Sequence, residues 1–190
     1  YMTPVVYLSD AFLGTGSEPW RLPDIADLPS LQVPNATDPA TFHPYDRDPV
    51  TLARPWAVPG TPGLEHRIGG LEKDYLTGNV SYAPTNHEQM IRVRARKIAG
   101  ITREIPPTEC FGPESGDLLL LGWGSTYGAI RQPVTEPNAA GHRVAHAHVR
   151  HMTPLPPDLG DILRRYRAVL VPEMNLGQLV RLVRAEYLVD

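Results

Sequence analysis

The distribution of proline constrains this chain more than any other feature. Ten of its 21 prolines lie between Pro19 and Pro62, spaced about every five residues. Proline lacks a backbone donor and has a fixed φ, so this density excludes long helices and central strands. A flexible Gly/Ser linker is excluded as well, because apolar and aromatic side chains lie between the prolines. These side chains are Trp20, Leu22, Ile25, Leu28, Leu31, Val33, Phe42, Tyr45, Trp56 and Val58. We expect residues 20–62 to form an extended strap buried against other protein.

Composition excludes several other classes of protein. The 190 residues include 42% hydrophobic and 21% charged residues, which is typical of a folded chain of one domain or slightly more. A formal net charge of −3 provides no positive field for nucleic acid. The single cysteine, Cys110, cannot by itself form an internal disulfide, a zinc tetrad or a four-thiolate iron–sulfur site. No apolar run approaches the ~20 residues of a membrane span, so a cytoplasmic location without membrane contact is expected.

The first half of the chain contains few regular elements. Residues 4–10 begin with apolar side chains that are β-branched or aromatic and end in polar ones, which predicts a short buried strand. No strand precedes it, which indicates that the chain begins inside a larger protein. A helix is predicted over 86–98, with a capping box at Thr85 and Glu88. Its apolar face would consist of Ile91, Ala95 and Ile98, and its outer face of Arg92, Arg96 and Lys97, a basic face that we interpret as solvated.

From about residue 112 the pattern changes to alternating strands and helices. Strands are predicted over 117–122, 143–149 and 168–171. One helix follows Asp158, with an apolar stripe of Leu159, Ile162, Leu163 and Tyr166, and another follows Asn175 and Gln178, which are spaced as a cap pair. A βαβαβα order with short connections predicts a parallel sheet in a compact α/β domain over 112–190.

The turn after the first of these strands is the first candidate site. Gly122, Gly124 and Ser125 lie where a strand ends and a helix begins, a place that favours anions. An NADP-type module is the alternative function, since Arg150 could accept a 2′-phosphate. The glycine spacing departs from G-x-G-x-x-G by one residue, however, and Pro133 and Pro137 allow the following helix only about two turns. The favoured interpretation is that these glycines permit a tight turn and close packing of the helix.

Asn175 is a candidate for a cleft or anion site, because it would lie in the crevice at the carboxyl ends of the parallel strands. Two further groups of residues are weaker candidates. His142, His146 and His148 have the same parity on a strand, with His151 nearby, and a His-x-His pair can bind zinc. No carboxylate or thiolate accompanies them, so packed histidines are favoured and no metal ligand is assigned. Glu65 and His66 lie in glycine-rich turns that either connect elements or line a cleft. No residue of the chain is assigned a catalytic role.

Several separated strings resemble one family. They are Ser9 to Gly14, Gly63 to Lys73, Thr77 to Tyr82, Leu120 to Ser125 and Val171 to Leu179. Together they are similar to the α subunit of 2-oxoacid:ferredoxin oxidoreductases, most closely of the 2-oxoglutarate type. The most specific strings are Pro172-Glu173-Met174-Asn175-Leu176-Gly177-Gln178 and the doubled Gly-Leu-Glu between Gly63 and Glu72. The segment from Gln132 to Pro137 departs from the family, whose members usually continue a charged helix there.

The resemblance implies a division of the chain and a set of partners. Residues 1–20 would end a thiamine-pyrimidine-type domain, residues 21–111 would form a proline-rich connector, and residues 112–190 would form a transketolase-C-terminal-like domain. The implied reaction is oxidative decarboxylation of a 2-oxoacid on thiamine diphosphate, with coenzyme A and ferredoxin as acceptors. Thiamine diphosphate, magnesium and a 4Fe-4S cluster would lie mainly on a β subunit, with a second α/β unit in the assembly. This segment alone would bind no cofactor and would be inactive. A non-enzymatic assembly module remains a further alternative.

Overall fold

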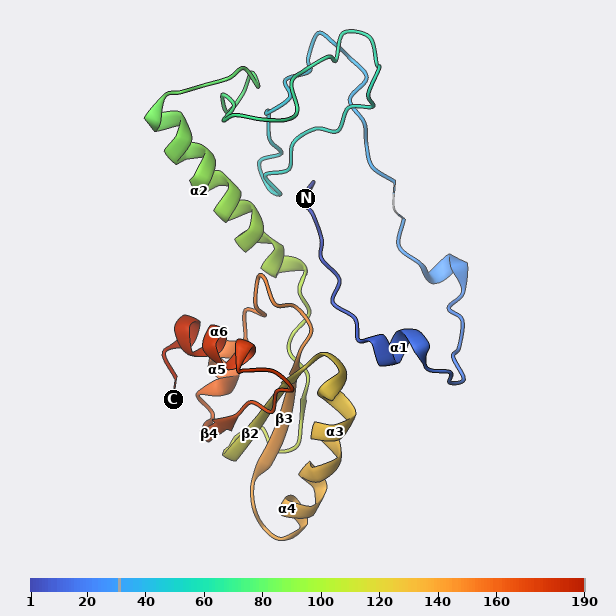
Figure 1. Ribbon diagram of the computed structural model, residues 1–190, viewed down its shortest axis with the longest axis vertical. Helices are drawn as coiled ribbons and strands as arrows, with labels where there is room; N and C mark the ends of the chain where they lie inside the picture. The colour runs from blue at the N-terminus through green and yellow to red at the C-terminus, as the bar shows by residue number, and fades with distance from the viewer. Residues whose placement is uncertain (31, 190) are drawn as a thin grey trace. The chain divides into compact units, whose positions relative to one another are not determined.

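The computed structural model describes residues 1–30 and 32–189 (Figure 1). The chain divides into two compact units. Unit 1 contains Tyr1–Val6 and Glu18–Ile101, and unit 2 contains Tyr7–Ser17 and Thr102–Asp190. Leu31 of the predicted strap and the last residue, Asp190, lie outside the described residues.

Unit 2 is built on a mixed sheet of four strands in the order β1-β3-β2-β4. The strands are β1 (Cys110–Phe111), β2 (Gly116–Trp123), β3 (Val144–Val149) and β4 (Tyr166–Leu170). The three predicted strands are confirmed within about two residues, and β2 lies parallel to both β3 and β4. The sheet is nevertheless not purely parallel, since β1 pairs with β3 in the antiparallel direction. A strand of two residues carries no periodicity, which is why the sequence did not reveal it.

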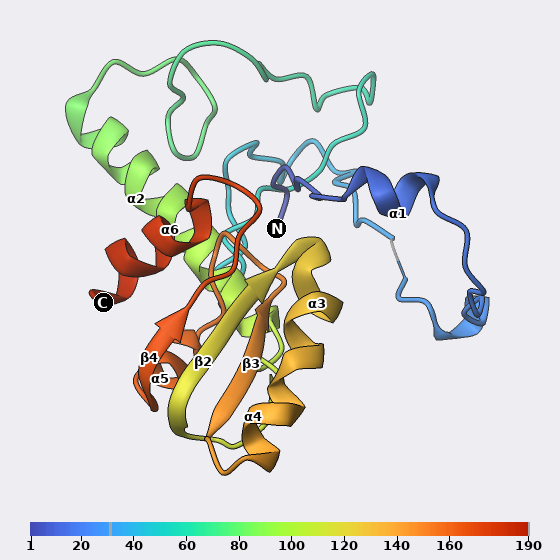
Figure 2. The same ribbon diagram turned by 60° about the horizontal axis from the view of Figure 1, so that its bottom comes forward.

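Helices cover both faces of this sheet (Figures 1 and 2). The elements that follow β2 are η3 (Gly124–Thr126), α3 (Tyr127–Arg131), η4 (Gln132–Val134) and α4 (Thr135–Ala139). The opposite face carries α5 (Leu159–Leu163) and α6 (Gln178–Tyr187). Leu119 and Leu121 of β2 are fully buried in the main core with residues of α5 and α6. On the other face Ile130 and Val134 are buried, so the leucine-rich strand is covered on both sides as predicted.

Prolines interrupt the segment after β2 as expected. The α-helical hydrogen bonding of α3 ends at Arg131, and the next turn, which contains Pro133, is a 3₁₀ helix. Pro133 has no N–H to donate, so the regular α-helical hydrogen-bond pattern cannot continue through this residue.

The structure corrects two predictions near α5. Tyr166 does not belong to the helical stripe, because the helix ends at Leu163 and Tyr166 begins β4. Its hydroxyl donates to the Pro113 carbonyl at 2.6 Å. Asp158 occupies the N-cap position but makes no capping bond. Its carboxylate instead accepts from the backbone amide and the hydroxyl of Thr108, both at 2.8 Å.

The predicted strand over residues 4–10 is wrong for this chain. The segment has no strand pairing, and Val5, Val6 and Tyr7 are more than 80% exposed. A strand is stable only when a neighbouring strand pairs with its backbone, and no strand among the described residues pairs with this segment. The short helix α1 (Ala11–Thr15) follows, capped by the Asp10 carboxylate, which accepts from the Phe12 amide.

In unit 1 the predicted helix is confirmed as α2 (Pro84–Gly100), but its buried face is different. Asn86, Met90 and Val93 are buried, whereas Ile91 is 48% exposed. The capping box does not form. Pro84 begins the helix, no side chain caps it, and Glu88 pairs with Arg92 one turn later at 2.7 Å. The apolar pattern was misassigned because the buried face includes a polar residue, Asn86.

Asn86 and Lys73 explain how a segment almost without regular elements packs on α2. The Asn86 amide donates to the Lys73 carbonyl at 2.8 Å and accepts from the Tyr75 amide at 3.1 Å. Lys73 is 2% exposed, and its ammonium donates to the carbonyls of Gly69, Gly70 and Leu71 at 2.5 to 3.1 Å. These bonds satisfy the buried polar groups and fix the glycine-rich turn.

The strap contains one short 3₁₀ helix, η1 (Ile25–Asp27), and a single bridge between Asn35 and Trp56 among its described residues. The connection from α2 into unit 2 contains η2 (Ile101–Glu104). Among the described residues no helix combines the length and the apolar character that crossing a membrane requires.

Candidate functional site

The carboxyl ends of the parallel strands bring together residues from three parts of unit 2. β2 ends at Trp123, β4 ends at Leu170, and the segment between β4 and α6 carries Glu173 and Asn175. The indole Nε1 of Trp123 donates to Glu173 Oε1 at 3.2 Å. In open α/β sheets this edge is where ligands most often bind, so its side chains are the first candidates for function.

Glu173 is the centre of this cluster. Its carboxylate accepts from the backbone amides of Leu179 and Val180 at 2.8 and 3.1 Å, and from the Asn175 side chain at 3.1 Å. Burial alone would raise the pKa of the carboxyl, but these hydrogen bonds outweigh it and hold the pKa below its usual value. Glu173 is therefore ionised at neutral pH and stabilises the positive end of α6.

Asn175 was predicted to cap the last helix. The N-cap position belongs to Gly177, which makes no side-chain capping bond, but Asn175 still accepts from the first amide of the helix. Its side-chain oxygen accepts from the amides of Gly177 and Gln178 at 2.7 and 3.0 Å. The helix itself begins after Gly177, whose φ of 84° suits glycine. The next two amides, those of Leu179 and Val180, donate to the Glu173 carboxylate. Sequence spacing did not predict this partner.

Replacing Asn175 by alanine should lower the free energy of unfolding by about 1 kcal/mol, the usual effect of losing a helix cap. Urea denaturation of the wild type and the variant measures the difference. Asn79→Ala, at an exposed asparagine of unit 1, is the control and should leave stability unchanged. Equal stability of Asn175→Ala and wild type would show that Glu173 alone caps the helix.

The glycine turn after β2 fits the packing interpretation. A Cβ on Gly122 would lie 2.5 Å from Ile130 Cδ1 and 3.0 Å from His148 Nδ1, so glycine allows α3 to approach the strand. Gly124 has a φ of 59°. Ser125 donates its hydroxyl to Asp10 Oδ2 at 2.7 Å. A carboxylate at this position disfavours an anion, and α3 has only five residues, so the packing interpretation is favoured and the anion site stays a prediction.

The predicted residues Glu65 and His66 lie in unit 1, where they line a cleft of about 440 Å³. His66 Nδ1 lies 2.8 Å from the Leu64 carbonyl oxygen, and its ring lies 5.2 Å from that of Phe42. Gly63, with a φ of 79°, begins this turn, and a Cβ there would lie 2.8 Å from Pro39. The cleft interpretation of Glu65 and His66 stays a prediction about function.

The histidines are only partly brought together. His146 and His148 share a face of β3, with ring centroids 5.5 Å apart. His142 precedes the strand, which begins at Val144, so the expectation that it shares their face is wrong. Among the described residues, no three side chains of histidine, cysteine, aspartate or glutamate are arranged to hold a metal ion.

Comparisons with known proteins agree on one family, although no protein-family model matches the chain. The chain is 51% identical to the 2-oxoglutarate oxidoreductase subunit KorA of Mycobacterium tuberculosis, over 100% of this chain and 29% of that protein. It is 29% identical to the α subunit of 2-oxoacid:ferredoxin oxidoreductase 1 of Aeropyrum pernix, over 98% of this chain and 30% of that protein. The chain thus spans less than a third of the length of these relatives.

A solved structure is similar as well. The 2-oxoglutarate:ferredoxin oxidoreductase of Magnetococcus marinus, with 2-oxoglutarate, coenzyme A and succinyl-CoA bound, matches 86% of this chain and 29% of that chain. The TM-score is 0.77 and the identity is 31%. The resemblance in the sequence motifs is confirmed: the chain is homologous over its whole length to a segment of the α subunit of 2-oxoacid:ferredoxin oxidoreductases. The Mycobacterium relative and the solved structure are of the 2-oxoglutarate type.

Proposed function

We propose that this chain is part of the α subunit of an enzyme that oxidatively decarboxylates 2-oxoglutarate and passes the electrons to ferredoxin. The observation that carries the proposal is the 51% identity to a 2-oxoglutarate oxidoreductase subunit over the whole chain. The solved relative, which binds 2-oxoglutarate, coenzyme A and succinyl-CoA, supports the same substrate and acyl acceptor. The product would then be succinyl-CoA.

The role of this segment in the reaction is that of a scaffold. Thiamine diphosphate needs a divalent cation with oxygen ligands, and an iron–sulfur cluster needs several thiolates. The residues present do not fit either group, since the described part contains no metal-ligand cluster and Cys110 is the chain's one cysteine. We therefore derive no chemical step through these groups. A β subunit would hold them, with a second α/β unit in the assembly.

The surface of the first 30 residues supports a role in assembly. Trp20, Leu22 and Ile25 are between 74% and 84% exposed, as large apolar side chains rarely are in a monomer. We propose that residues 20–62 lie against another subunit. Residues 112–190, which contain most of the sheet of unit 2 and the helices on its two faces, would be the transketolase-C-terminal-like domain. Residues 1–20 would be the end of the pyrimidine-type domain.

The NADP-type module is not favoured. In the glycine turn Ser125 donates to the Asp10 carboxylate, whose negative charge disfavours a phosphate. The helix that follows, α3, has only five residues. The non-enzymatic assembly module leaves the 51% identity to an enzyme subunit unexplained.

Calorimetric titration with thiamine diphosphate and magnesium tests the division of labour. The chain alone should give no heat above dilution, because the metal and diphosphate ligands would lie on the partner. A complex of the complete α subunit with its β subunit should give saturable heat. Micromolar binding by the chain alone would contradict the proposed role of this segment, even if the assembled enzyme were active.

A further inference from the structure

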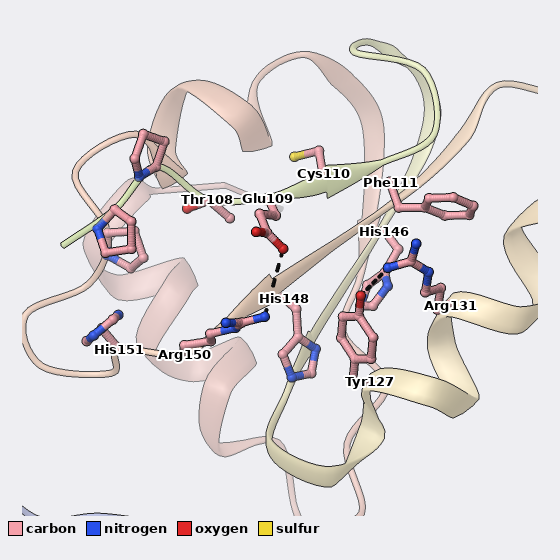
Figure 3. A pocket seen from close by; sticks show the side chains of 13 residues that line it. Thr108, Glu109, Cys110, Phe111, Tyr127, Arg131, His146, His148, Arg150 and His151 are labelled. Carbon is pink, nitrogen blue, oxygen red and sulfur yellow. Dashed lines mark hydrogen bonds and ion pairs between the residues drawn. The ribbon is translucent and has the colours of Figure 1, made fainter. Parts of the chain in front are cut away.

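Unit 2 contains a cleft that the proposed function does not use (Figure 3). Its volume is about 300 Å³, near the lower limit for pockets that bind small molecules. The walls come from three places: the segment through β1, the strand β3 with the residues after it, and the helix α3. The lining side chains used below are Glu109, Tyr127, Arg131, His146, His148 and Arg150.

The cleft is electropositive. Arg131 and Arg150 line it, and Glu109 is its one carboxylate among the described residues. The ion pair between Arg150 and Glu109 is long, at 3.8 Å, and both side chains are more than two-thirds exposed. Such a pair contributes little, so Arg150 can exchange Glu109 for a ligand at small cost.

The Arg131 guanidinium is held in place before any ligand arrives. It lies over the Phe111 ring, 4.3 Å from the centroid, and donates to the Tyr127 hydroxyl. A guanidinium fixed in this way loses little conformational freedom when it binds an oxyanion.

Two imidazole nitrogens of histidines that line the cleft have no hydrogen-bond partner. His146 is 2% exposed, and its Nε2 is buried and unpaired. The Nδ1 of His148 is likewise buried and unpaired. A native structure seldom leaves such atoms unsatisfied, because each costs desolvation free energy without a compensating bond. A bound molecule with matching polar groups would satisfy them.

The chemistry of His148 specifies what the molecule must offer. His148 Nε2 lies 3.1 Å from the Gly124 carbonyl oxygen, which can only accept, so Nε2 carries the proton. Burial lowers the pKa of His148, and it lowers the pKa of His146 to about 4, with further contributions from His148 and Arg131. Both rings are therefore neutral at pH 7. His148 Nδ1 is then a lone-pair acceptor that needs an O–H or N–H donor.

We propose that this cleft binds a small hydroxylated anion, with its oxyanion on Arg131 and Arg150 and its hydroxyl donating to His148 Nδ1. A hydroxy acid and a phosphate ester of a polyol share this chemistry. In either case the hydroxyl is the group that a simple electropositive patch would not recognise.

Two matched pairs of probes test the proposal by calorimetry on the complete chain. Malate and succinate differ by one hydroxyl, and glycerol 3-phosphate and propyl phosphate differ by two. In the pair whose anion fits, the hydroxylated member should bind about tenfold more tightly, since a buried acceptor left unpaired costs about this much. The pair that binds identifies the anion. No saturable binding by any probe, or equal affinities within both pairs, would overturn the proposal.

Substitutions locate the site. Arg150→Gln should weaken binding about tenfold. Arg164→Gln, at an exposed arginine directly after α5 with a similar surface ion pair to Asp161, should not change it. His148→Phe keeps an aromatic ring at this position but removes both nitrogens, including the Nδ1 acceptor, so it should abolish the preference for the hydroxylated probe.

A measurement on the wild type keeps the proposal testable if the His148 variant fails to fold. Side-chain ¹⁵N resonances of His146 and His148 should shift on titration with the hydroxylated probe, and those of His87 in unit 1 should not. Binding without a shift at His148 would place the ligand elsewhere and contradict the proposal.

Discussion

Replacing Glu173 by alanine is expected to lower the free energy of unfolding of unit 2 by about 3 kcal/mol. The carboxylate accepts from the amides of Leu179 and Val180, from Asn175 and from the Trp123 indole. Its removal leaves the amides of Leu179 and Val180 without their acceptor and the Trp123 indole N–H unpaired at the end of β2. Leu179 is fully buried, so water cannot easily replace the lost acceptor.

Hydrogen exchange measures this effect at the affected atoms. The amides of Leu179 and Val180 should exchange about 100-fold faster in Glu173→Ala. Glu186→Ala, at an exposed glutamate of the same helix, is the matched control and should leave both rates unchanged. Unchanged exchange in Glu173→Ala would show that the carboxylate does not hold the start of α6.

The same carboxylate predicts a pH dependence. Its pKa is lower in the folded protein than in the unfolded chain, so its contribution to stability is complete above the ordinary pKa of a glutamate. That contribution is lost as the pH falls through the lowered folded pKa. Stability should therefore fall less steeply in acid for Glu173→Ala than for the wild type.

Leu121→Ala is the second substitution with a large expected effect. Leu121 is fully buried in the core between β2 and the helices α5 and α6, and truncation leaves a cavity. The free energy of unfolding should fall by about 3 to 4 kcal/mol. The control is Leu170→Ala on β4, where the side chain is 54% exposed and the loss should stay below about 1 kcal/mol. Equal losses at the two positions would contradict the assigned core.

The sequence predicted unit 2 well because its signals are local. The run of leucines in β2 and the apolar run around Ala145 each predict a buried strand, and the structure has a parallel strand at both places. Pro133 predicts the break that follows α3. The antiparallel strand β1 could not be predicted, because two residues carry no pattern. Glu173 was missed as a cap since it reaches α6 across a turn, from outside the usual N-cap spacing.

Unit 1 was harder to predict because polar side chains hold it together. The face of α2 that packs on the connector includes Asn86, and the glycine-rich turn is fixed by the buried Lys73. Hydrophobic periodicity does not find such contacts. At the candidate site, Ser125 and Asn175 form hydrogen bonds within the chain. The cleft at His146 could not be predicted, because two strands and a helix form it and the sequence does not show how they pack together.

The proposed place of this chain in a 2-oxoglutarate:ferredoxin oxidoreductase is tested most directly by turnover. The complete α subunit that contains this chain would be co-expressed with its β subunit and assayed for ferredoxin reduction in the absence of oxygen. Reduction should require 2-oxoglutarate, coenzyme A and thiamine diphosphate together, produce succinyl-CoA, and stop when the β subunit is omitted. A correctly assembled, cofactor-loaded complex that reduced ferredoxin with pyruvate but not with 2-oxoglutarate, or with neither, would contradict the account.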